Sequence, residues 1–402
     1  MYKQVTLLPG KEANVAFRHP WIFSGALASI PDELEHGDLV SVLDKNGKVL
    51  GTGTYSAKTS IAVRVFDFGD TTIDKAFFAE RFRLAAERRR FLGYGPDMQT
   101  TGYRLVFGES DGLPGLVVDV YGDVFVMQIA TAGMDRLRDV VVETIVDQFA
   151  PRLIVERSDL PIRREEGLEP VVAVRHGDTD VNAQIVVSFL ENGMTYKADV
   201  LKGQKTGFFF DQKALRAFMM RSPWMCEGRR VLNLFSYSGA TGLAAMHAGA
   251  ASVLNIDGSD AALTLAQENA SLNSVDPKAF TAEKHDVFQW LGAHQEQEYD
   301  MVIIDPPALI KSGREVDDGK KAYHFLNRAA MRLVKTGGLF ITSSCSHFLP
   351  EEDLAFILRR ASVQSGIDLD VITIIRQAAD HPLSVYFPEA AYLKTFVCRV
   401  TR

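Results

Sequence analysis

The feature that most constrains the fold is a regular alternation of short apolar runs and helical stretches in the second half of the chain. A hairpin signal precedes the alternation, with Glu191-Asn-Gly193 as the turn between two strand-like runs. Alternation at this spacing predicts a parallel sheet with helices on both faces. We expect strands at 231–235, 253–257, 301–305 and 339–343, with helices from residue 241 and at 260–272, 320–334 and 351–365.

The first half of the chain has a different pattern. Short β-rich runs broken by turn signals suggest a small barrel, and an amphipathic helix follows. Further strands, a helix and a polar, loop-rich stretch come next. The β-rich runs lie at 39–43, 48–51 and 61–66, the turn signals at 44–47 and 51–53, the helices at 75–92 and 135–149, a short strand at 153–155 and the loop-rich stretch at 162–180. We therefore expect an α/β chain with a barrel at 1–70, a middle α+β domain at 71–180 and a larger α/β domain at 181–402.

Composition limits the class of protein. Contents of 47% hydrophobic and 24% charged residues are ordinary for a soluble globular protein. No apolar run reaches the roughly 18 residues of a membrane span, and the N-terminus lacks the pattern of a secretion signal. The cysteines Cys226, Cys345 and Cys398 are widely spaced, which argues against a disulfide framework or a zinc site. We expect a cytoplasmic protein with neither a metal ion nor a membrane partner.

The net charge of −7 does not favour general binding to nucleic acid. Any contact with RNA must therefore come from a local basic cluster, and a solvated helix face is the alternative interpretation. The clearest cluster contains Arg81, Arg83, Arg88, Arg89 and Arg90, opposed by Glu80 and Glu87.

The end of the strand at 231–235 is the candidate cofactor site, because ligands of open α/β sheets bind beyond the carboxyl ends of the strands. Ser236-Tyr-Ser-Gly239 runs directly into a helix, and Gly239 and Gly242 would allow close approach of the backbone to a ligand. The motif is not GxGxxG and no basic residue follows it, which argues against a dinucleotide or a nucleoside triphosphate.

Two acids extend this site. Asp257 ends the second strand about twenty residues later, where an acid takes ribose hydroxyls. Asp286 follows the next β-like stretch and is placed to meet an adenine edge. For each acid alone, a helix cap or a solvated loop is the alternative. Together they indicate an adenosine cofactor without phosphates, S-adenosylmethionine.

Phe208, Phe209 and Phe210 lie between the hairpin and the strand at 231–235, and three consecutive aromatic residues cannot all face one core from a strand. They would cover the cofactor, with Asp211 and Gln212 hydrogen-bonding it, unless they form an edge strand packed on both sides. The full set of candidate cofactor residues is Phe209, Asp211, Gln212, Asn233, Phe235, Ser236, Tyr237, Gly239, Asp257, Asp286 and Asp305.

The reactive centre is expected at the next two strand ends. Asp305 stands at a strand tip, and the rigid Pro306 and Pro307 would stack on a flat base whose polar edge the acid binds. Cys345 follows the next strand among polar neighbours, although a free cysteine is more often a small buried hydrophobe. A thiolate is needed to methylate pyrimidine C5, because addition at C6 makes C5 nucleophilic. We expect Cys345 and Asp305 to be catalytic; the base for the C5 proton is not assigned.

In these residues and motifs the chain resembles the bacterial 23S rRNA cytosine-C5 methyltransferases of the large-subunit type, and the resemblance covers essentially its whole length. The resemblance suggests the cytosine at position 1962 and implies an N-terminal PUA-like barrel, a middle α+β domain, a C-terminal Rossmann-like class I methyltransferase domain, and Cys345 as the nucleophile. Pro306 stands where other RNA cytosine-C5 methyltransferases carry a second cysteine, and Ser238 replaces a frequent threonine. The matching motifs begin at Arg104, Asp111, Glu156, Arg163, Lys205, Asn233, Asp305 and Ser344, and the tail from Arg376 to Lys394 also matches.

The expected partner is 23S rRNA or a large-subunit assembly intermediate, contacted through the barrel and through Arg81 and Arg88; the resemblance also allows a homodimer. The target base must be accessible or flipped. One rival is a guanine or amine methyltransferase on the same scaffold, which Ala308 disfavours because the usual stacking aromatic is missing after the prolines. The other rival is a non-catalytic RNA-binding assembly factor.

Overall fold

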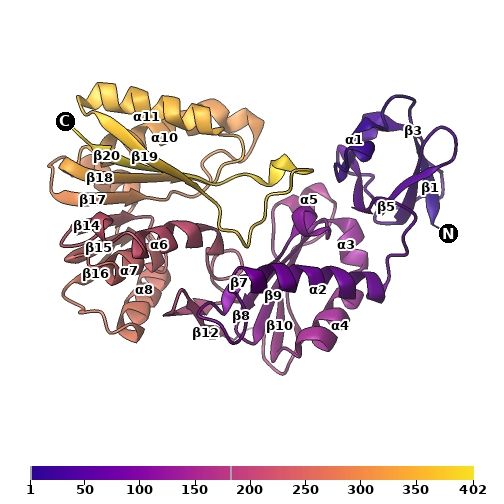
Figure 1. The fold of residues 1–402 in the computed structure, drawn as a ribbon, viewed down its shortest axis with the longest axis horizontal. Coiled ribbons are helices and arrows are strands. Elements are labelled where there is room, and N and C mark those ends of the chain that lie inside the picture. Colours follow the sequence, from indigo (N-terminus) through magenta and orange to yellow (C-terminus); the bar gives the residue numbers. More distant parts are fainter. Residues whose placement is uncertain (1, 182) are drawn as a thin grey trace. The chain divides into compact units, whose positions relative to one another are not determined.

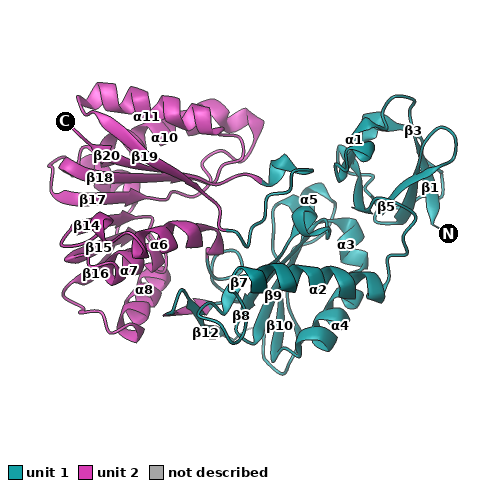
Figure 2. Cartoon of the chain, viewed as in Figure 1, with its two compact units in different colours: residues 1–193, 199–208, 379–390 teal, residues 194–198, 209–378, 391–402 magenta. Residues whose placement is uncertain are grey.

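The computed structural model describes residues 2–181 and 183–402, and its chain divides into two compact units. Unit 1 contains residues 1–193, 199–208 and 379–390, and unit 2 contains residues 194–198, 209–378 and 391–402 (Figure 2). Each unit is built around its own sheets (Figure 1). None of the described helices is both long and apolar enough to cross a membrane.

A six-stranded sheet opens unit 1 in the order β2-β6-β5-β4-β1-β3. Val5, Val40, Val42 and Val63 are completely buried and form its apolar cluster with their neighbours. The β4–β5 turn follows from Asp44, whose carboxylate accepts hydrogen bonds from the backbone amides two and four residues later. The elements are β1 (Lys3–Leu7), α1 (Ala13–Ala16), β2 (Trp21–Phe23), β3 (Leu27–Ser29), β4 (Leu39–Leu43), β5 (Val49–Tyr55) and β6 (Ile61–Asp67).

The glycines at 51 and 53 lie inside β5, so the turn expected at 51–53 was wrong. A Cβ on Gly53 would lie 2.3 Å from the backbone oxygen of Arg64, and one on Gly51 would lie 3.0 Å from that of Asp67. The two glycines therefore allow β5 to approach β6 closely, and close approach of two backbones is a common reason for glycine within a strand.

A five-stranded sheet in the order β11-β10-β9-β8-β7 forms the rest of unit 1. Helix α2 covers it with Phe78, Phe82 and Ala85, and Asp74 caps the start of α2 by accepting a hydrogen bond from the amide of Phe77. The elements are α2 (Lys75–Phe91), β7 (Gly102–Phe107), β8 (Leu116–Tyr121), β9 (Val124–Ile129), α3 (Ala132–Arg136), α4 (Arg138–Phe149), β10 (Leu153–Ser158), α5 (Ile162–Glu165) and β11 (Val171–His176).

Two expectations for this region were wrong. The single helix expected at 135–149 is divided at Leu137, which ends α3 and precedes α4. The stretch expected to be loop-rich contains α5 and the strand β11, which pairs antiparallel with β10. The strand was missed because it is short and the residues on either side of it in this stretch are polar.

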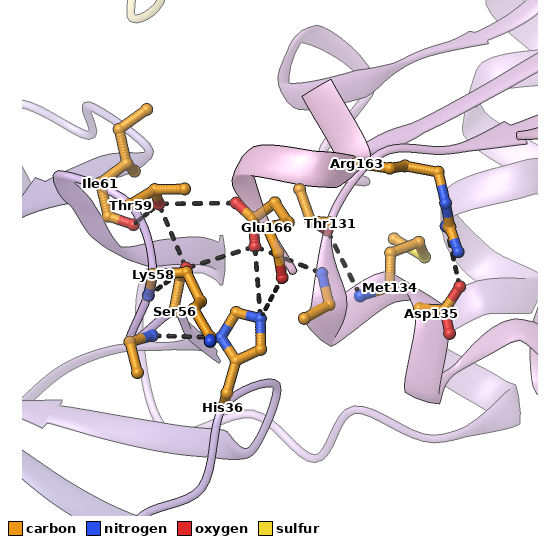
Figure 3. Close-up of polar contacts among 12 residues, drawn as sticks. His36, Ser56, Lys58, Thr59, Ile61, Thr131, Met134, Asp135, Arg163 and Glu166 are labelled. Carbon is orange, nitrogen blue, oxygen red and sulfur yellow. Dashed lines mark hydrogen bonds and ion pairs between the residues drawn. The ribbon is translucent and has the colours of Figure 1, made fainter. Parts of the chain in front are cut away.

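Glu166 joins the six-stranded sheet to α3 through a buried carboxylate (Figure 3). The carboxylate accepts hydrogen bonds from Ser56 Oγ at 3.2 Å, from Arg64 Nη1 at 2.7 Å and from the backbone amide of Ala132 at 3.4 Å. The Glu166 carbonyl oxygen lies 2.7 Å from His36 Nε2. A buried carboxylate with this many donors holds several segments at fixed positions.

Residues 379–390 connect two strands of unit 2 but pack into unit 1; we call them the return segment (Figure 2). The completely buried Asp380 accepts a hydrogen bond from the amide of Arg104 at 3.1 Å, and its carbonyl oxygen accepts one from Arg89 at 2.8 Å. Further along, the rings of Phe387 and Trp21 meet edge to face at 4.8 Å between centroids. The return segment therefore completes the interior of unit 1.

A seven-stranded sheet in the order β16-β15-β14-β17-β18-β20-β19 forms the centre of unit 2. The expected Rossmann-like α/β architecture is confirmed. Strands β14 to β18 are parallel, and the helices pack against one another in two groups. Strands β12 (Val186–Glu191) and β13 (Met194–Asp199) flank a turn in which Asn192 and Gly193 have positive φ, as the hairpin signal predicts. The elements are α6 (Lys213–Met220), β14 (Arg230–Leu234), α7 (Ala240–His247), β15 (Ser252–Asp257), α8 (Asp260–Leu272), β16 (Phe280–Lys284), α9 (Val287–Ala293), β17 (Tyr299–Ile304), α10 (Val316–Met331), β18 (Val334–Ser344), α11 (Glu351–Ser365), β19 (Leu369–Arg376) and β20 (Lys394–Val400).

The sheet is not wholly parallel, because β20 inserts antiparallel between β18 and β19. The alternation of strands and helices did not indicate this edge, since no helix separates β19 from β20. The insertion has a consequence for the site, because it places Lys394 of β20 opposite Ser344 at the end of β18.

Candidate active site

The turn that follows β14 is backbone in an unusual conformation. Phe235, Tyr237 and Gly239 all have positive φ, at 58°, 46° and 73°. Two of these residues are not glycine, and such conformations cost about 1–3 kcal/mol each and concentrate at ligand sites. The sequence motif expected to hold the cofactor is therefore the most strained turn at this edge of the sheet.

Gly239 and Gly242 are needed for packing beneath this turn. A Cβ on Gly239 would lie 2.8 Å from Cβ of Ala266, and one on Gly242 would lie 2.6 Å from Oδ1 of Asn255. Close approach of a ligand is the role expected for both glycines from the sequence motif. The structure gives each of them a close protein neighbour that excludes a side chain.

Asp257 holds the turn from the next strand. Its carboxylate accepts hydrogen bonds from the amide of Tyr237 at 2.9 Å and from the amide of Ser259 at 3.0 Å. The side chain is only partly buried, and a carboxylate has about four acceptor positions, so Asp257 retains capacity for hydroxyl groups of a ligand. The structure thus brings the first and second predicted motifs into direct contact.

Ser236 shows that a polar ligand fits here. Its Oγ is buried and has no hydrogen-bond partner among the described residues, although a buried hydroxyl without a partner is costly. An adenosine group with ribose hydroxyls offers such a partner. Ser236, Asp257 and the backbone of the turn are therefore the residues that fit S-adenosylmethionine.

The aromatic run lies beside the turn with one ring turned toward it. Phe209 is partly exposed and meets the ring of Tyr237 edge to face, with centroids 5.2 Å apart. Phe208 and Phe210 are buried. The backbone at Phe210–Gln212 is a short 3-10 turn, so the alternative of an edge strand was wrong.

Asp211 and Gln212 are buried and bonded to protein groups. The Asp211 carboxylate accepts a hydrogen bond from the hydroxyl of Tyr392 at 2.7 Å, and Gln212 Nε2 donates to Ser343 Oγ at 3.2 Å. Both contacts link the aromatic run to the strand ends that carry the reactive centre. The two residues thus position Phe209 whether or not they also reach a ligand.

Asn233 and Asp286 have structural partners of their own. Asn233 is buried within β14, and its amide donates to Asn255 Oδ1 at 2.9 Å. Asp286 is exposed and caps α9 by accepting a hydrogen bond from the amide of Gln289 at 2.9 Å. The helix cap weighed for Asp286 is present, and a contact of either residue with the cofactor stays a prediction.

Asp305 follows β17 at the same edge of the sheet. Ile304 is the register partner of Leu234 in β14 and of Thr342 in β18, so Asp305 lies between the cofactor turn and the end of β18. Pro306 is buried and Pro307 is exposed. Pro307 is therefore the proline of this pair whose face is accessible to a base.

Cys345 comes directly after β18 and is partly exposed. Its neighbours Ser344 and Ser346 are buried, and both hydroxyls are hydrogen-bonded to the hydroxyl of Tyr323, at 2.9 Å and 3.0 Å. Burial raises the pKa of Tyr323, so this phenol is a neutral partner at ordinary pH. The cysteine is thus held between two residues that α10 fixes.

The other two thiols differ sharply. Cys226 and Cys398 are completely buried, and burial raises the pKa of each thiol to about 12. A thiol that stays protonated is a poor nucleophile. Cys345 is therefore the thiol of this chain that a substrate can reach.

Lys394 and Tyr323 are candidate residues that the sequence analysis did not single out. Lys394 lies opposite Ser344 across β18 and β20, and its Nζ donates to the carbonyl oxygen of Ser346 at 2.7 Å. A lysine at the start of a strand that contains the apolar run Phe396-Val-Cys398 was the sequence signal for it. Tyr323 offered no comparable signal within its helix.

The basic cluster of α2 is largely neutralised. Arg89 is completely buried and pairs with Asp111, whose carboxylate also accepts a hydrogen bond from Arg88 at 2.6 Å. Arg81 pairs with Asp67 at 2.7 Å. The expectation that Arg89 belongs to a solvent-facing patch was wrong, because its partners lie far away in the sequence. Arg83 pairs with Glu80 and Glu87, and Arg90 is exposed.

Comparisons with known proteins agree with this geometry. A family model described as a PUA-like domain matches residues 5–68, and one described as an S-adenosylmethionine-dependent methyltransferase matches residues 181–363. The crystal structure of SMU.776 complexed with SAH has a TM-score of 0.83 and covers 99% of this chain and 100% of that chain. At 22% identity, that likeness concerns the fold alone.

Curated relatives match the chain from end to end. Ribosomal RNA large subunit methyltransferase I of Shewanella amazonensis is 38% identical over 99% of both chains. The protein of the same name from Pseudoalteromonas atlantica is 37% identical over 100% of both chains. The chain therefore belongs to the family of S-adenosylmethionine-dependent methyltransferases whose curated members are named Ribosomal RNA large subunit methyltransferase I.

Proposed function

We propose that this methyltransferase modifies C5 of a cytosine in 23S rRNA through a covalent bond between Cys345 and C6 of the base. One observation carries the proposal: a partly exposed thiol follows the strand beside the one that leads to Asp305. Methylation of an exocyclic amine does not require a thiol, since the amine nitrogen is itself the nucleophile.

The chemistry gives each residue of the strand ends a role. The Cys345 thiolate adds to C6, and the electron pair of the C5–C6 double bond becomes available at C5. When bound, S-adenosylmethionine supplies an electrophilic methyl group. Loss of the C5 proton to a base then restores the double bond and expels the thiolate. Asp305 accepts a hydrogen bond from the polar edge of the cytosine, and Pro307 stacks on its face.

The proposed cofactor contacts follow from the turn. Ser236, Asp257 and the backbone of the turn hold the ribose end, and Phe209 with Tyr237 covers the ligand. The other expected contacts, from Phe235, Gly239, Asn233, Asp211, Gln212 and Asp286, remain part of the proposal; several of these groups also bind protein.

Ribosomal RNA as substrate is supported by the names of the relatives and by the PUA-like match at residues 5–68. We propose that the six-stranded sheet contacts the RNA and presents an accessible or flipped base. Arg81 and Arg88 would take part by breaking their contacts with Asp67 and Asp111 and binding phosphate oxygens instead. Because the net charge of the chain is −7, it would bind RNA at a local basic contact and not through its overall charge.

Nucleoside mass spectrometry tests the proposal. The protein is incubated with S-adenosylmethionine and unmodified 23S rRNA, which is then digested; 5-methylcytidine is expected. Cys345→Ala should abolish the product, whereas Cys226→Ala is the matched control for loss of one thiol. RNA carrying 5-fluorocytidine should in addition form an adduct stable to denaturation, because fluorine at C5 cannot leave as a proton.

The other outcomes decide between the rival functions. Methylguanosine or methyladenosine, formed equally by Cys345→Ala, would show an amine or purine methyltransferase. Binding of the RNA without any product on rRNA or on assembly intermediates would show a non-catalytic assembly factor.

A further inference from the structure

A buried lysine stands beside the reactive cysteine. Lys394 is only 6% exposed, at the start of β20. Its Nζ donates hydrogen bonds to the carbonyl oxygens of Ser346 at 2.7 Å and of Tyr392 at 2.9 Å. An ammonium group has three donors, so one N–H is left after these two contacts.

The charge of this lysine needs an anionic partner, because a buried charge is costly unless it is paired. No carboxylate forms an ion pair with Lys394 in the part of the chain that the structure describes. Cys345 lies between Ser344, the register partner of Lys394, and Ser346, whose carbonyl oxygen accepts its hydrogen bond, and it raises the pKa of Lys394 more than Glu351 does. Glu351 is already paired with Arg376, at 2.8 Å. The thiolate of Cys345 is therefore the anion that this site lacks.

We propose that Lys394 is the counter-ion of the Cys345 thiolate and holds it ionised and oriented toward the substrate. The inference rests on the proposed covalent role of Cys345. Lys394 is a positioning residue, because it acts through the thiol and through the backbone on either side of it.

Four elements define the surroundings of the pair. Strand β20 supplies Lys394, α10 supplies the neutral Tyr323, and the remaining charged neighbours are Glu351 of α11 and Arg376 of β19. Burial lowers the pKa of Lys394 to about 8, so the ammonium form predominates below that pH. A cation in a partly desolvated site lowers the pKa of a thiol, whose ordinary value is about 8.5.

The test is the pH dependence of alkylation of Cys345 by iodoacetamide, measured without RNA by mass spectrometry of the modified peptide. In the wild-type protein the rate should rise with a midpoint at least one pH unit below about 8.5. In Lys394→Met the midpoint should move upward by at least one unit, so that the rate at pH 7 falls roughly tenfold. Lys394→Arg should retain most of the wild-type profile.

Two controls separate charge from structure. Lys394→Gln keeps a donor for the carbonyl of Ser346 but removes the charge, so it should resemble Lys394→Met. Each variant must bind S-adenosylmethionine with wild-type affinity, which shows that the fold is intact. Cys345→Ala assigns any remaining alkylation to Cys226 and Cys398.

The results distinguish this inference from the proposed function. A wild-type midpoint at or above about 8.5, or equal midpoints in wild-type protein and Lys394→Gln, would overturn the pairing even if 5-methylcytidine is formed. A low midpoint that depends on Lys394, together with no 5-methylcytidine, would retain the pair and overturn the cytosine-C5 reaction.

Discussion

The carboxylate of Asp257 accepts a hydrogen bond from the backbone amide of Tyr237 at 2.9 Å, and this contact joins the ends of β15 and β14. It holds a turn in which Phe235, Tyr237 and Gly239 all have positive φ. The side chain expected to bind the cofactor therefore also maintains the backbone on which the cofactor would rest.

Replacing Asp257 should weaken cofactor binding by two routes at once. Asp257→Ala removes the acceptor of the Tyr237 amide and the acceptor for a ribose hydroxyl. Hydrogen bonds to a charged group contribute about 1.5–3 kcal/mol each, so the Kd for S-adenosylmethionine should rise at least tenfold. Isothermal titration calorimetry measures it. Asp260→Ala, an exposed acid three residues later that pairs with Lys284, is the control. Equal affinities in both variants would contradict the assignment.

Gly239→Ala should destabilise the protein. The new methyl group would lie 2.8 Å from Cβ of Ala266, at a φ of +73° that side chains rarely adopt. We expect the free energy of unfolding to fall by about 1–3 kcal/mol, measured in urea. Gly292→Ala is the matched control, because no atom lies within 4 Å of its new Cβ and the residue is in α9. That control should be neutral or stabilised by about 0.4–1 kcal/mol.

Glu166→Gln should destabilise unit 1, because the change removes the nearer carboxylate of the buried Arg64, at 2.7 Å, and leaves it only Glu109, at 4.0 Å. Breaking a buried ion pair costs about 3–5 kcal/mol. Thermal unfolding and limited proteolysis should both show the loss. The adjacent, exposed Glu165→Gln removes the same charge at the surface and should change the free energy of unfolding by less than about 0.5 kcal/mol. A small effect at Glu166 would mean that the carboxylate is not needed.

Lys394 should make the stability of the protein depend on pH. Its folded pKa of about 8 lies below the ordinary 10.5, so between these values the unfolded chain binds more protons and stability rises with pH. Lys394→Met removes this dependence. Lys394→Met should therefore gain the most stability relative to wild type below pH 8. This difference in the free energy of unfolding should decrease by about 3 kcal/mol as the pH rises to 10.5. Both proteins carry Cys345→Ala, so that a shifted Cys345 thiol does not contribute to the difference, and Cys226 and Cys398 titrate equally in both. Parallel stability curves in urea across this range would contradict the lowered pKa.

Much of unit 2 could be predicted because strand–helix alternation reports directly on a parallel sheet. The position of Asp257 against the cofactor turn follows from that sheet, since the carboxyl ends of parallel strands meet at one edge. The antiparallel insertion of β20 could not be predicted in the same way. Residues between β19 and β20 form no α-helix, and those at 379–390 belong to unit 1.

Contacts distant in the sequence account for the errors of detail. Arg89 reads as part of a solvated basic face, yet it is buried because Asp111 and the carbonyl of Asp380 satisfy it. Gly53 reads as a turn residue, yet it lies in β5 because the backbone of Arg64 leaves no room for a side chain. In each case the deciding neighbour is absent from the local sequence, whereas the turn expected at 44–47 is held by Asp44, which lies within it.

The return segment has a consequence for how the chain is made. Domains generally fold during synthesis from the N-terminus onward. Here the interior of unit 1 can be completed only after Asp380 and Phe387 have been synthesised, and these residues leave the ribosome just before β20. Until then Arg89 lacks one of its acceptors and Trp21 lacks its aromatic neighbour. The N-terminal half of the newborn chain should therefore stay sensitive to proteases until the return segment has been synthesised, and any fragment that ends before Asp380 should remain protease-sensitive.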